Sequence, residues 1–385
     1  MKVMHLSDLH LGKSILEQSL IEDQKYILNQ IIDIVREKKV DVVFIAGDVY
    51  DKGIPNVEAV RLFSEFLTKL YQLKVKVFVI SGNHDSKDRL SFGNELFVDN
   101  GVYIEGVFNG NLKKNVVFDE FGEMCIYLLP FVKPADVRIY YPEEEINSYH
   151  QAVECIIKHT EIDKTKRNVI LVHQFVTSNG AELEYGGSEN LSLGGLDNID
   201  VSLFEEFDYV ALGHIHRGQK LIRDTIRYAG SPLKYSFNEV HQRKSVPIVT
   251  FFEKGNIDID LVDLVPLRDM RAIQGTLEHL LDKDVVSLGN PDDYISAIIT
   301  DEDYIMDVIG KLRMVYKNIL RLEYQNSRTL GVFSEKNMAQ GEIHLRSELD
   351  LFEEFYLNQN HIELDEERTQ IVHKVISQLK EKVDL

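Results

Sequence analysis

Apolar residues recur with two different periods along the first two thirds of the chain. Short runs rich in valine and isoleucine, typical of buried strands, alternate with longer stretches whose apolar positions follow the period of a helix. We predict strands at residues 3–7, 42–46, 75–80, 169–172 and 209–212, and helices at residues 22–38 and 57–70. Strands that alternate with helices favour an α/β domain whose sheets are covered by helices. We expect this domain to span residues 1–262.

The pattern changes at residues 264–267, an apolar segment that we interpret as a linker. A smaller α+β domain should follow it over residues 265–335. Its predicted elements are a strand at 294–300, a helix at 301–317 and a strand at 319–324. Thr300 and Asp303 have the spacing of capping residues for that helix.

Residues 340–385 carry two further amphipathic helices, which we predict at 347–358 and 365–383. Their apolar faces could pack on their own domain or bind a partner protein. We favour a partner, because a face rich in phenylalanine and tyrosine is more than a terminal appendage needs.

The composition limits the class of protein. A chain of 385 residues is too long for one core, and its 44% hydrophobic and 28% charged residues are typical of a globular protein. No apolar run reaches the roughly 20 residues that span a bilayer. Asp8 and His10 interrupt the start of the chain before a signal-peptide core could form. With two cysteines and no membrane segment, the protein is expected in the cytoplasm.

The formal net charge of −20 argues against a protein that holds nucleic acid by a broad basic face. Contact with DNA would depend on bound cations, on a partner, or on a local basic strip. One such strip lies between residues 217 and 244. Its basic residues are Lys220, Arg223, Arg227, Lys234 and Arg243, opposed only by Asp224 and Glu239. It could track phosphates or simply be a solvated hairpin.

Side chains of the metal-ligand type follow five apolar runs. They are Asp8 and His10 in SDLHLG, Asp48 in AGDVYD, Asn83 and His84 in SGNHDS, His173 in LVHQF, and His214 and His216 in LGHIH. Ligands of open α/β sheets gather at the carboxyl ends of the strands, so these residues should share one edge. Imidazole mixed with carboxylate suits Mn, Fe or Zn better than Mg or Ca. Asp48 is the natural bridge between two cations roughly 3.5–4 Å apart.

Each motif alone has an ordinary structural explanation. Gly-Asp and Gly-Asn pairs are common turns, and His173 could be a buried histidine with satisfied hydrogen bonds. The joint occurrence of all five, in order and always at a strand end, favours a metal site.

Together the motifs resemble the signature of the calcineurin-like metallophosphoesterase superfamily, which reads D-x-H, G-D, G-N-H-[DE], a lone H and G-H-x-H. The resemblance covers about the first 240 residues and implies a sandwich of two sheets flanked by helices. It also implies two divalent cations. One would be held by Asp8, His10, Asp48 and His216, and the other by Asp48, Asn83, His173 and His214.

The same resemblance implies a catalytic role for His84. This imidazole would contact the phosphoryl oxygen and assist the leaving group. Either Asp51 or Asp85 would orient it.

Several flanking segments are similar to SbcD nucleases. They are residues 10–13, 22–24, 173–176, 213–217 and 230–237. Leu9 departs from the pattern, because many SbcD-like sequences carry tryptophan there. The resemblance implies a Mn²⁺-dependent nuclease that acts on DNA ends in double-strand-break and hairpin processing. It would be an exonuclease on duplex and an endonuclease on single strands and hairpins, by two-metal hydroxide attack on the phosphodiester.

The SbcD resemblance also implies an assembly. A homodimer would join through the helix after Asp51 and form a heterotetramer with the SMC-like ATPase SbcC. Residues 265–335 would be a capping domain that guides DNA, and the C-terminal helices would dock on SbcC.

Two other functions remain open. A cyclic-nucleotide phosphodiesterase or phosphoprotein phosphatase could use the same metal site, but it would not need residues 265–385. A non-catalytic scaffold would have lost metal ligands, and none is lost here.

Overall fold

The computed structural model describes residues 1–178, 197–303 and 305–326, with scattered positions between 349 and 375. The chain divides into two compact units. The larger comprises Met1–Ile273, Leu280–Ala297 and Ile309–Leu322, and the smaller comprises Gln274–His279, Ile298–Val308 and Glu323–Leu385.

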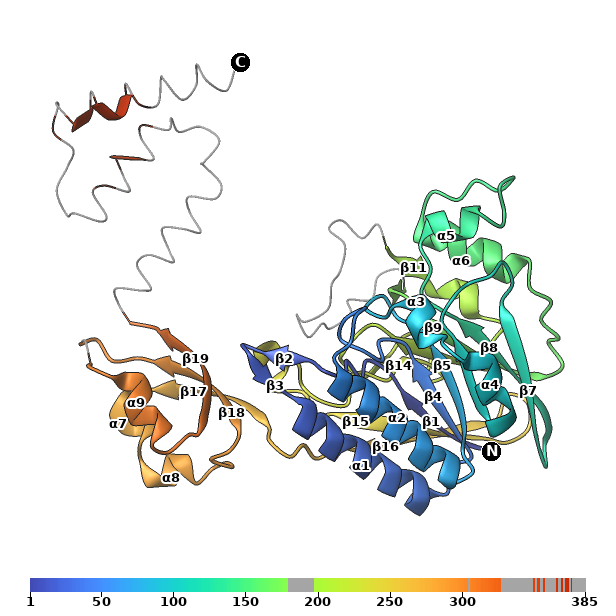
Figure 1. Ribbon diagram of the computed structural model, residues 1–385, viewed down its shortest axis with the longest axis horizontal. Helices are drawn as coiled ribbons and strands as arrows, with labels where there is room; N and C mark the ends of the chain where they lie inside the picture. Colours follow the sequence, from blue (N-terminus) through green and yellow to red (C-terminus); the bar gives the residue numbers. More distant parts are fainter. Residues whose placement is uncertain are drawn as a thin grey trace. The chain divides into compact units, whose positions relative to one another are not determined.

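Two six-stranded sheets form the centre of the larger unit (Figure 1). The first has the order β16-β15-β1-β4-β5-β6, with β1, β4, β5 and β6 parallel to one another. Its strands are β1 (Lys2–Leu6), β4 (Val42–Ala46), β5 (Lys76–Ile80), β6 (Val102–Glu105), β15 (Ser245–Phe251) and β16 (Ile257–Asp263).

The second sheet has the order β13-β14-β12-β9-β8-β7, with β8, β9, β12 and β14 parallel. Its strands are β7 (Lys113–Asp119), β8 (Gly122–Leu129), β9 (Arg167–His173), β12 (Tyr209–Gly213), β13 (Gln219–Lys220) and β14 (Ile226–Tyr228). The strands predicted from the apolar runs are therefore present, most within two residues of their expected ends.

Alternate residues of each strand enter different layers of the core. In β4, Phe44 packs between the two sheets, whereas Val43 and Ile45 face helices α1 (Ile21–Lys38) and α2 (Val57–Gln72). In β9, Leu171 lies between the sheets and Val172 packs with α6 (Tyr149–Lys158) and α5 (Pro134–Arg138). Strands buried on both faces explain why their sequences are continuously apolar. The expected sandwich of two sheets flanked by helices is confirmed.

Local signals fix the ends of the two long helices. The Asn56 side chain accepts a hydrogen bond of 2.8 Å from the Ala59 amide and so caps the start of α2. Helix α1 ends at Lys39, which has a left-handed conformation with φ of 55°.

Short elements complete this part of the chain. They are β2 (Ser14–Ile15), β3 (Gln18–Ser19), α3 (Lys87–Leu90), α4 (Asn94–Phe97), β10 (Val176–Thr177), β11 (Ile199–Asp200) and the 3₁₀ helices η1 (Val98–Asn100), η2 (Val201–Phe204) and η3 (Phe237–Glu239).

A separate three-stranded sheet follows the predicted linker, in the order β17-β18-β19. The elements here are β17 (Met270–Gly275), β18 (Tyr294–Ile299), β19 (Asn318–Tyr324), α7 (Leu277–Leu280), α8 (Lys283–Val286) and α9 (Val308–Arg313). The prediction of one helix over residues 301–317 is wrong. Asp307 has a left-handed φ of 53° and the Asp301 carboxylate accepts a hydrogen bond from the Leu277 amide, so the chain before Val308 is not helical.

The helices predicted at residues 347–358 and 365–383 lie almost entirely outside the described residues. In the part of the chain that is described, no helix combines the length and apolar character needed to cross a bilayer.

Candidate metal centre

The predicted ligands come from the carboxyl ends of parallel strands in both sheets. Strands β1, β4 and β5 lead into Asp8, Asp48 and Asn83, and strands β9 and β12 of the other sheet lead to His173 and His214. The structure brings all seven predicted ligands to this edge of the sandwich, where most of them are almost fully buried. The expected convergence is therefore observed.

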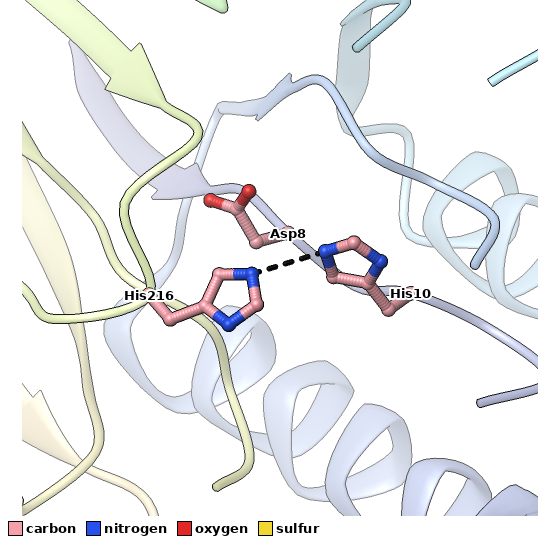
Figure 2. Close-up of side chains that lie close together, drawn as sticks. All are labelled: Asp8, His10 and His216. Carbon is pink, nitrogen blue, oxygen red and sulfur yellow. Dashed lines mark hydrogen bonds between the residues drawn. The ribbon is translucent and has the colours of Figure 1, made fainter. Parts of the chain in front are cut away.

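A first group consists of Asp8, His10 and His216 (Figure 2). The two imidazoles direct their Nε2 atoms toward each other at 3.1 Å, and the Asp8 carboxylate lies beside them. One donor atom from each of the three side chains falls within 4.8 Å of the others.

A second group forms around Asn83. Its Oδ1 atom lies 3.1 Å from His173 Nε2 and 3.0 Å from His214 Nδ1. Asp48 lies between the two groups, because its Oδ2 atom is 3.5 Å from His10 Nε2 and 3.4 Å from His173 Nε2. A carboxylate in that position has the geometry of a bridge.

Three glycines of the motifs allow the backbone and the ligands to approach this closely. A Cβ atom at Gly82 would lie 2.1 Å from Asp48 Oδ1, and one at Gly213 would lie 1.9 Å from the Ala46 carbonyl oxygen. A Cβ atom at Gly47 would lie 2.2 Å from His173 Nδ1. No larger residue fits at these positions without moving a ligand.

Four of the predicted ligands have a left-handed backbone, which is costly for residues other than glycine. The φ angles are 53° for Asp8, 43° for His10, 49° for Asp48 and 98° for His214. Hydrogen bonds hold these turns: the Asp8 amide donates to the Gly47 carbonyl at 3.1 Å, and the His214 amide donates to Asp8 Oδ1 at 3.0 Å.

The surroundings of His84 distinguish between the two residues proposed to orient it. His84 Nδ1 lies 2.9 Å from the backbone carbonyl oxygen of Asp51. The Asp85 carboxylate instead accepts hydrogen bonds from the amides of Val49, Tyr50 and Gly82. Asp51 therefore contacts His84 through its main chain, while Asp85 shapes the neighbouring loops.

Burial and charge set the protonation of the centre. Burial lowers the pKa of His10, and burial with the His173 charge lowers the pKa of His214 to about 3. Burial alone would lower the pKa of His173, but the Asp48 carboxylate raises it to about 9. Burial acts to raise the pKa of Asp48, yet the charges of His173 and His10 hold it well below its usual range.

These properties fit a pair of divalent cations. Neutral imidazoles offer lone pairs, and the ionised Asp48 attracts positive charge to its neighbourhood, as the raised pKa of His173 demonstrates. Mixed nitrogen and oxygen donors of this kind suit Mn²⁺, Fe²⁺ or Zn²⁺.

Several residues that support the centre were not predicted from the sequence. The Gln24 side chain donates to the His10 carbonyl at 2.7 Å and accepts from the Gly12 amide at 2.9 Å. The Tyr235 hydroxyl donates to the Leu9 carbonyl at 2.5 Å. Both residues lie in segments that resemble SbcD nucleases, and that resemblance was the only signal for them.

Comparisons with known proteins agree with this geometry. The model of the Calcineurin-like phosphoesterase family matches residues 1–218, and the SbcD_C model, described as the type 5 capsule protein repressor C-terminal domain, matches residues 266–360. The chain is 32% identical over 380 residues to the D subunit of the nuclease SbcCD of Staphylococcus epidermidis, which covers 98% of each chain. The chain belongs to the SbcD family of calcineurin-like phosphoesterases.

Among solved structures, a dimetal phosphatase from Danio rerio has a TM-score of 0.41 and 10% identity, covering 69% of this SbcD-family chain and 98% of its own. A likeness this low carries no information about substrate.

The basic strip of this SbcD-family chain is not a continuous exposed surface. Strands β13 and β14 form an antiparallel pair, as the hairpin interpretation expected. Arg227 is buried, Lys220 forms an ion pair with Asp224 at 2.6 Å, and Lys234 forms one with Asp269 at 2.8 Å. Arg243 is exposed.

A cavity of about 210 Å³ adjoins the centre at Asn83 and His214. Its other lining residues are Phe131, Lys133, Tyr149, Gln174, Phe175 and Asp197. Three aromatic rings and one lysine thus lie next to the second ligand group.

Proposed function

We propose that this SbcD-family chain is a Mn²⁺-dependent DNA nuclease that acts on DNA ends, as an exonuclease on duplex and an endonuclease on single strands and hairpins. The observation that carries the proposal is the Asp48 carboxylate between two groups of nitrogen and oxygen donors. The relative named as part of a nuclease, similar over nearly the whole chain, supports the substrate class.

In this proposal, Asp8, His10, Asp48 and His216 hold one cation, and Asp48, Asn83, His173 and His214 hold the other. Two such cations supply a Lewis acid for the phosphodiester and make water acidic enough to yield hydroxide near neutral pH. His84, oriented by the Asp51 carbonyl, stabilises the phosphoryl oxygen and protonates the leaving group. The aromatic cavity beside Asn83 favours a nucleotide over a phosphopeptide, because aromatic rings stack on bases.

The hydrolysis of four substrates tests the nuclease function. The full chain with added Mn²⁺ should cleave linear duplex and hairpin DNA and leave a cyclic nucleotide and a phosphopeptide unchanged. Asp48→Ala should abolish cleavage, because it removes the shared ligand. Preference for the cyclic nucleotide or the phosphopeptide would overturn the nuclease assignment.

We also propose the domain division and the partner expected from the sequence. Residues 1–262 would form the nuclease domain, 265–335 the capping domain, and 340–385 the segment that binds the SMC-like ATPase SbcC. The name of the relative, one component of SbcCD, supports an ATPase partner. A chain that ends at residue 339 should retain simple nuclease activity and bind that ATPase more weakly than the full chain, as surface plasmon resonance would measure.

A homodimer, and a heterotetramer with the ATPase, complete the proposed assembly. An apolar hollow of about 550 Å³ supports it, since its lining includes Val60, Tyr71, Phe92 and Phe97, which we call the α2–α4 patch. Phe92 is 83% exposed and Tyr71 is 51% exposed. An exposed apolar surface of this kind marks an interaction site, and we assign it to a second copy of the chain.

A further inference from the structure

The two imidazoles drawn in Figure 2 have a common arrangement behind them. Their Nε2 atoms face each other, and the opposite nitrogen of each ring faces a carboxylate. His10 Nδ1 lies 3.5 Å from Asp51 Oδ1, and His216 Nδ1 lies 3.7 Å from Glu239 Oε1. Each ring is therefore held between its neighbour and a negative charge.

Each of these carboxylates also has a lysine. Lys13 Nζ lies 2.8 Å from Asp51 Oδ1, and Lys244 Nζ lies 2.6 Å from Glu239 Oε2. Two chains of lysine, carboxylate and imidazole thus converge on the same point from opposite sides.

The Glu239 chain is the more deeply buried of the two. Glu239 has no exposed surface and Lys244 is 8% exposed. Lys244 also donates to the His216 carbonyl at 2.8 Å, to Ser231 Oγ at 3.0 Å and to Gln242 Oε1 at 2.9 Å. Burying an ion pair costs free energy unless its members are fully hydrogen-bonded, so this network is a built feature that fixes the position of the Glu239 carboxylate.

The other two ligand imidazoles have neutral neighbours at the corresponding nitrogen. His173 Nδ1 lies 2.7 Å from the carbonyl oxygen of Ala46, and His214 Nδ1 lies 3.0 Å from the amide oxygen of Asn83. A carboxylate behind an imidazole fixes its tautomer and makes it a stronger donor to a metal than a neutral acceptor does. The two ligand groups therefore differ in the charge behind their imidazoles.

We propose that Glu239, held in place by Lys244, is a positioning residue for His216 and makes the Asp8, His10 and His216 position the tighter of two cation positions. The inference rests on the proposed function only in that these residues hold divalent cations. Glu239 lies in none of the five motifs.

Titration of the full, metal-free chain with Mn²⁺, followed by the electron paramagnetic resonance signal of unbound Mn²⁺, tests the proposal. The unaltered chain should bind two Mn²⁺ ions with unequal affinities. Glu239→Gln should weaken the tighter position by about 10- to 100-fold and leave the weaker one essentially unchanged, since loss of such a supporting group typically has that effect. Glu239→Asp should restore part of the affinity.

Loss of folding must be separated from loss of positioning. Glu239→Gln leaves Lys244 buried without its counter-charge, so the variant should be less stable than the unaltered chain. In the double variant Glu239→Gln/Lys244→Met the buried charges are removed together, which should restore the thermal stability while Mn²⁺ binding stays weak. Asp119→Asn, which breaks a different buried ion pair with Arg167, is the matched control and should bind Mn²⁺ normally.

The outcomes are distinct. Unchanged Mn²⁺ binding in Glu239→Gln, or recovery of binding together with stability in the double variant, would overturn the positioning role while the metal centre stands. If the unaltered chain binds no Mn²⁺, the proposed centre itself is wrong.

Discussion

His84 differs from the other histidines of the centre in the way it is held. Its Nδ1 faces the Asp51 carbonyl, and its amide donates to Asp48 Oδ1 at 2.9 Å. Its ring also stands edge-on to His10, with centroids 4.8 Å apart, and it can form a ligand group with His10 and Asp48. Position alone therefore leaves two roles for this residue, as an acid or as a ligand, and a variant separates them.

His84→Ala should keep both Mn²⁺ ions and lose activity. The expected fall in kcat is about 10²- to 10⁴-fold, the usual contribution of a general acid. Mn²⁺ titration and single-turnover cleavage of hairpin DNA measure the two properties separately. Normal turnover would exclude the catalytic role, and a lost Mn²⁺ ion would make His84 a ligand.

At the scale of elements, strand β9 carries one functional group at each end. His173 ends the strand in the metal centre, whereas Arg167 begins it. The Arg167 guanidinium donates to both carboxylate oxygens of Asp119 and to the carbonyls of Gly122 and Phe252. The amino-terminal group of Met1 pairs with Asp119 at 3.0 Å. This cluster ties the two sheets together at the edge opposite to the centre.

The Asp119 cluster should make stability depend on pH in acid. Burial acts to raise the pKa of Asp119, but the Arg167 guanidinium and the terminal amine lower it to about 2. A carboxyl group with a lowered pKa stabilises the fold fully above its unfolded pKa and loses that effect as the pH falls toward 2. Asp119→Asn should therefore lower the free energy of unfolding by about 2 kcal/mol at pH 7. Urea unfolding should show this difference narrowing below pH 4; a constant difference would contradict the assignment.

The elements that the sequence predicted well are those with one dominant cause. Strand β4 is apolar at every position because both of its faces are buried, and its observed bounds equal the predicted ones. The helix expected at residues 301–317 failed because side-chain hydrogen bonding and a left-handed Asp307 competed with its periodicity.

Within the metal centre, the motifs predicted which side chains would meet but not what supports them. Glu239 was counted only as a charge opposing the basic strip, although it is buried behind His216. A contact across more than twenty residues, made by a loop without a motif, leaves no local pattern. The left-handed turns at Asp8 and His214 were likewise invisible, because nothing in a single sequence marks such a turn at a residue other than glycine.

At the scale of the whole molecule, the α2–α4 patch is the surface that bears on assembly. It lies on the helix that follows Asp51, where the family resemblance placed the dimer interface. Burying its exposed aromatic side chains would gain roughly 25 cal/mol for each Å² of apolar area, which favours self-association.

Phe92→Glu should convert the dimer to a monomer, because it places a charge in the middle of an apolar contact. Analytical ultracentrifugation would measure the mass, and cleavage of a short single strand should persist because Phe92 is not part of the centre. Ile222→Glu, at an exposed position 57% accessible in the β13–β14 hairpin, is the control and should remain dimeric. A monomeric unaltered chain would contradict the proposed homodimer.

The left-handed ligands set the interests of the fold against those of the site. Asp8, His10, Asp48 and His214 occupy a conformation that glycine adopts with little cost and that other residues adopt at a cost of order 1 kcal/mol or more each. Glycine at these positions would relieve the backbone while deleting the donors. Selection for thermal stability alone would thus tend to erase the catalytic machinery, and efforts to engineer a hardier variant should leave these four turns untouched and look for gains elsewhere.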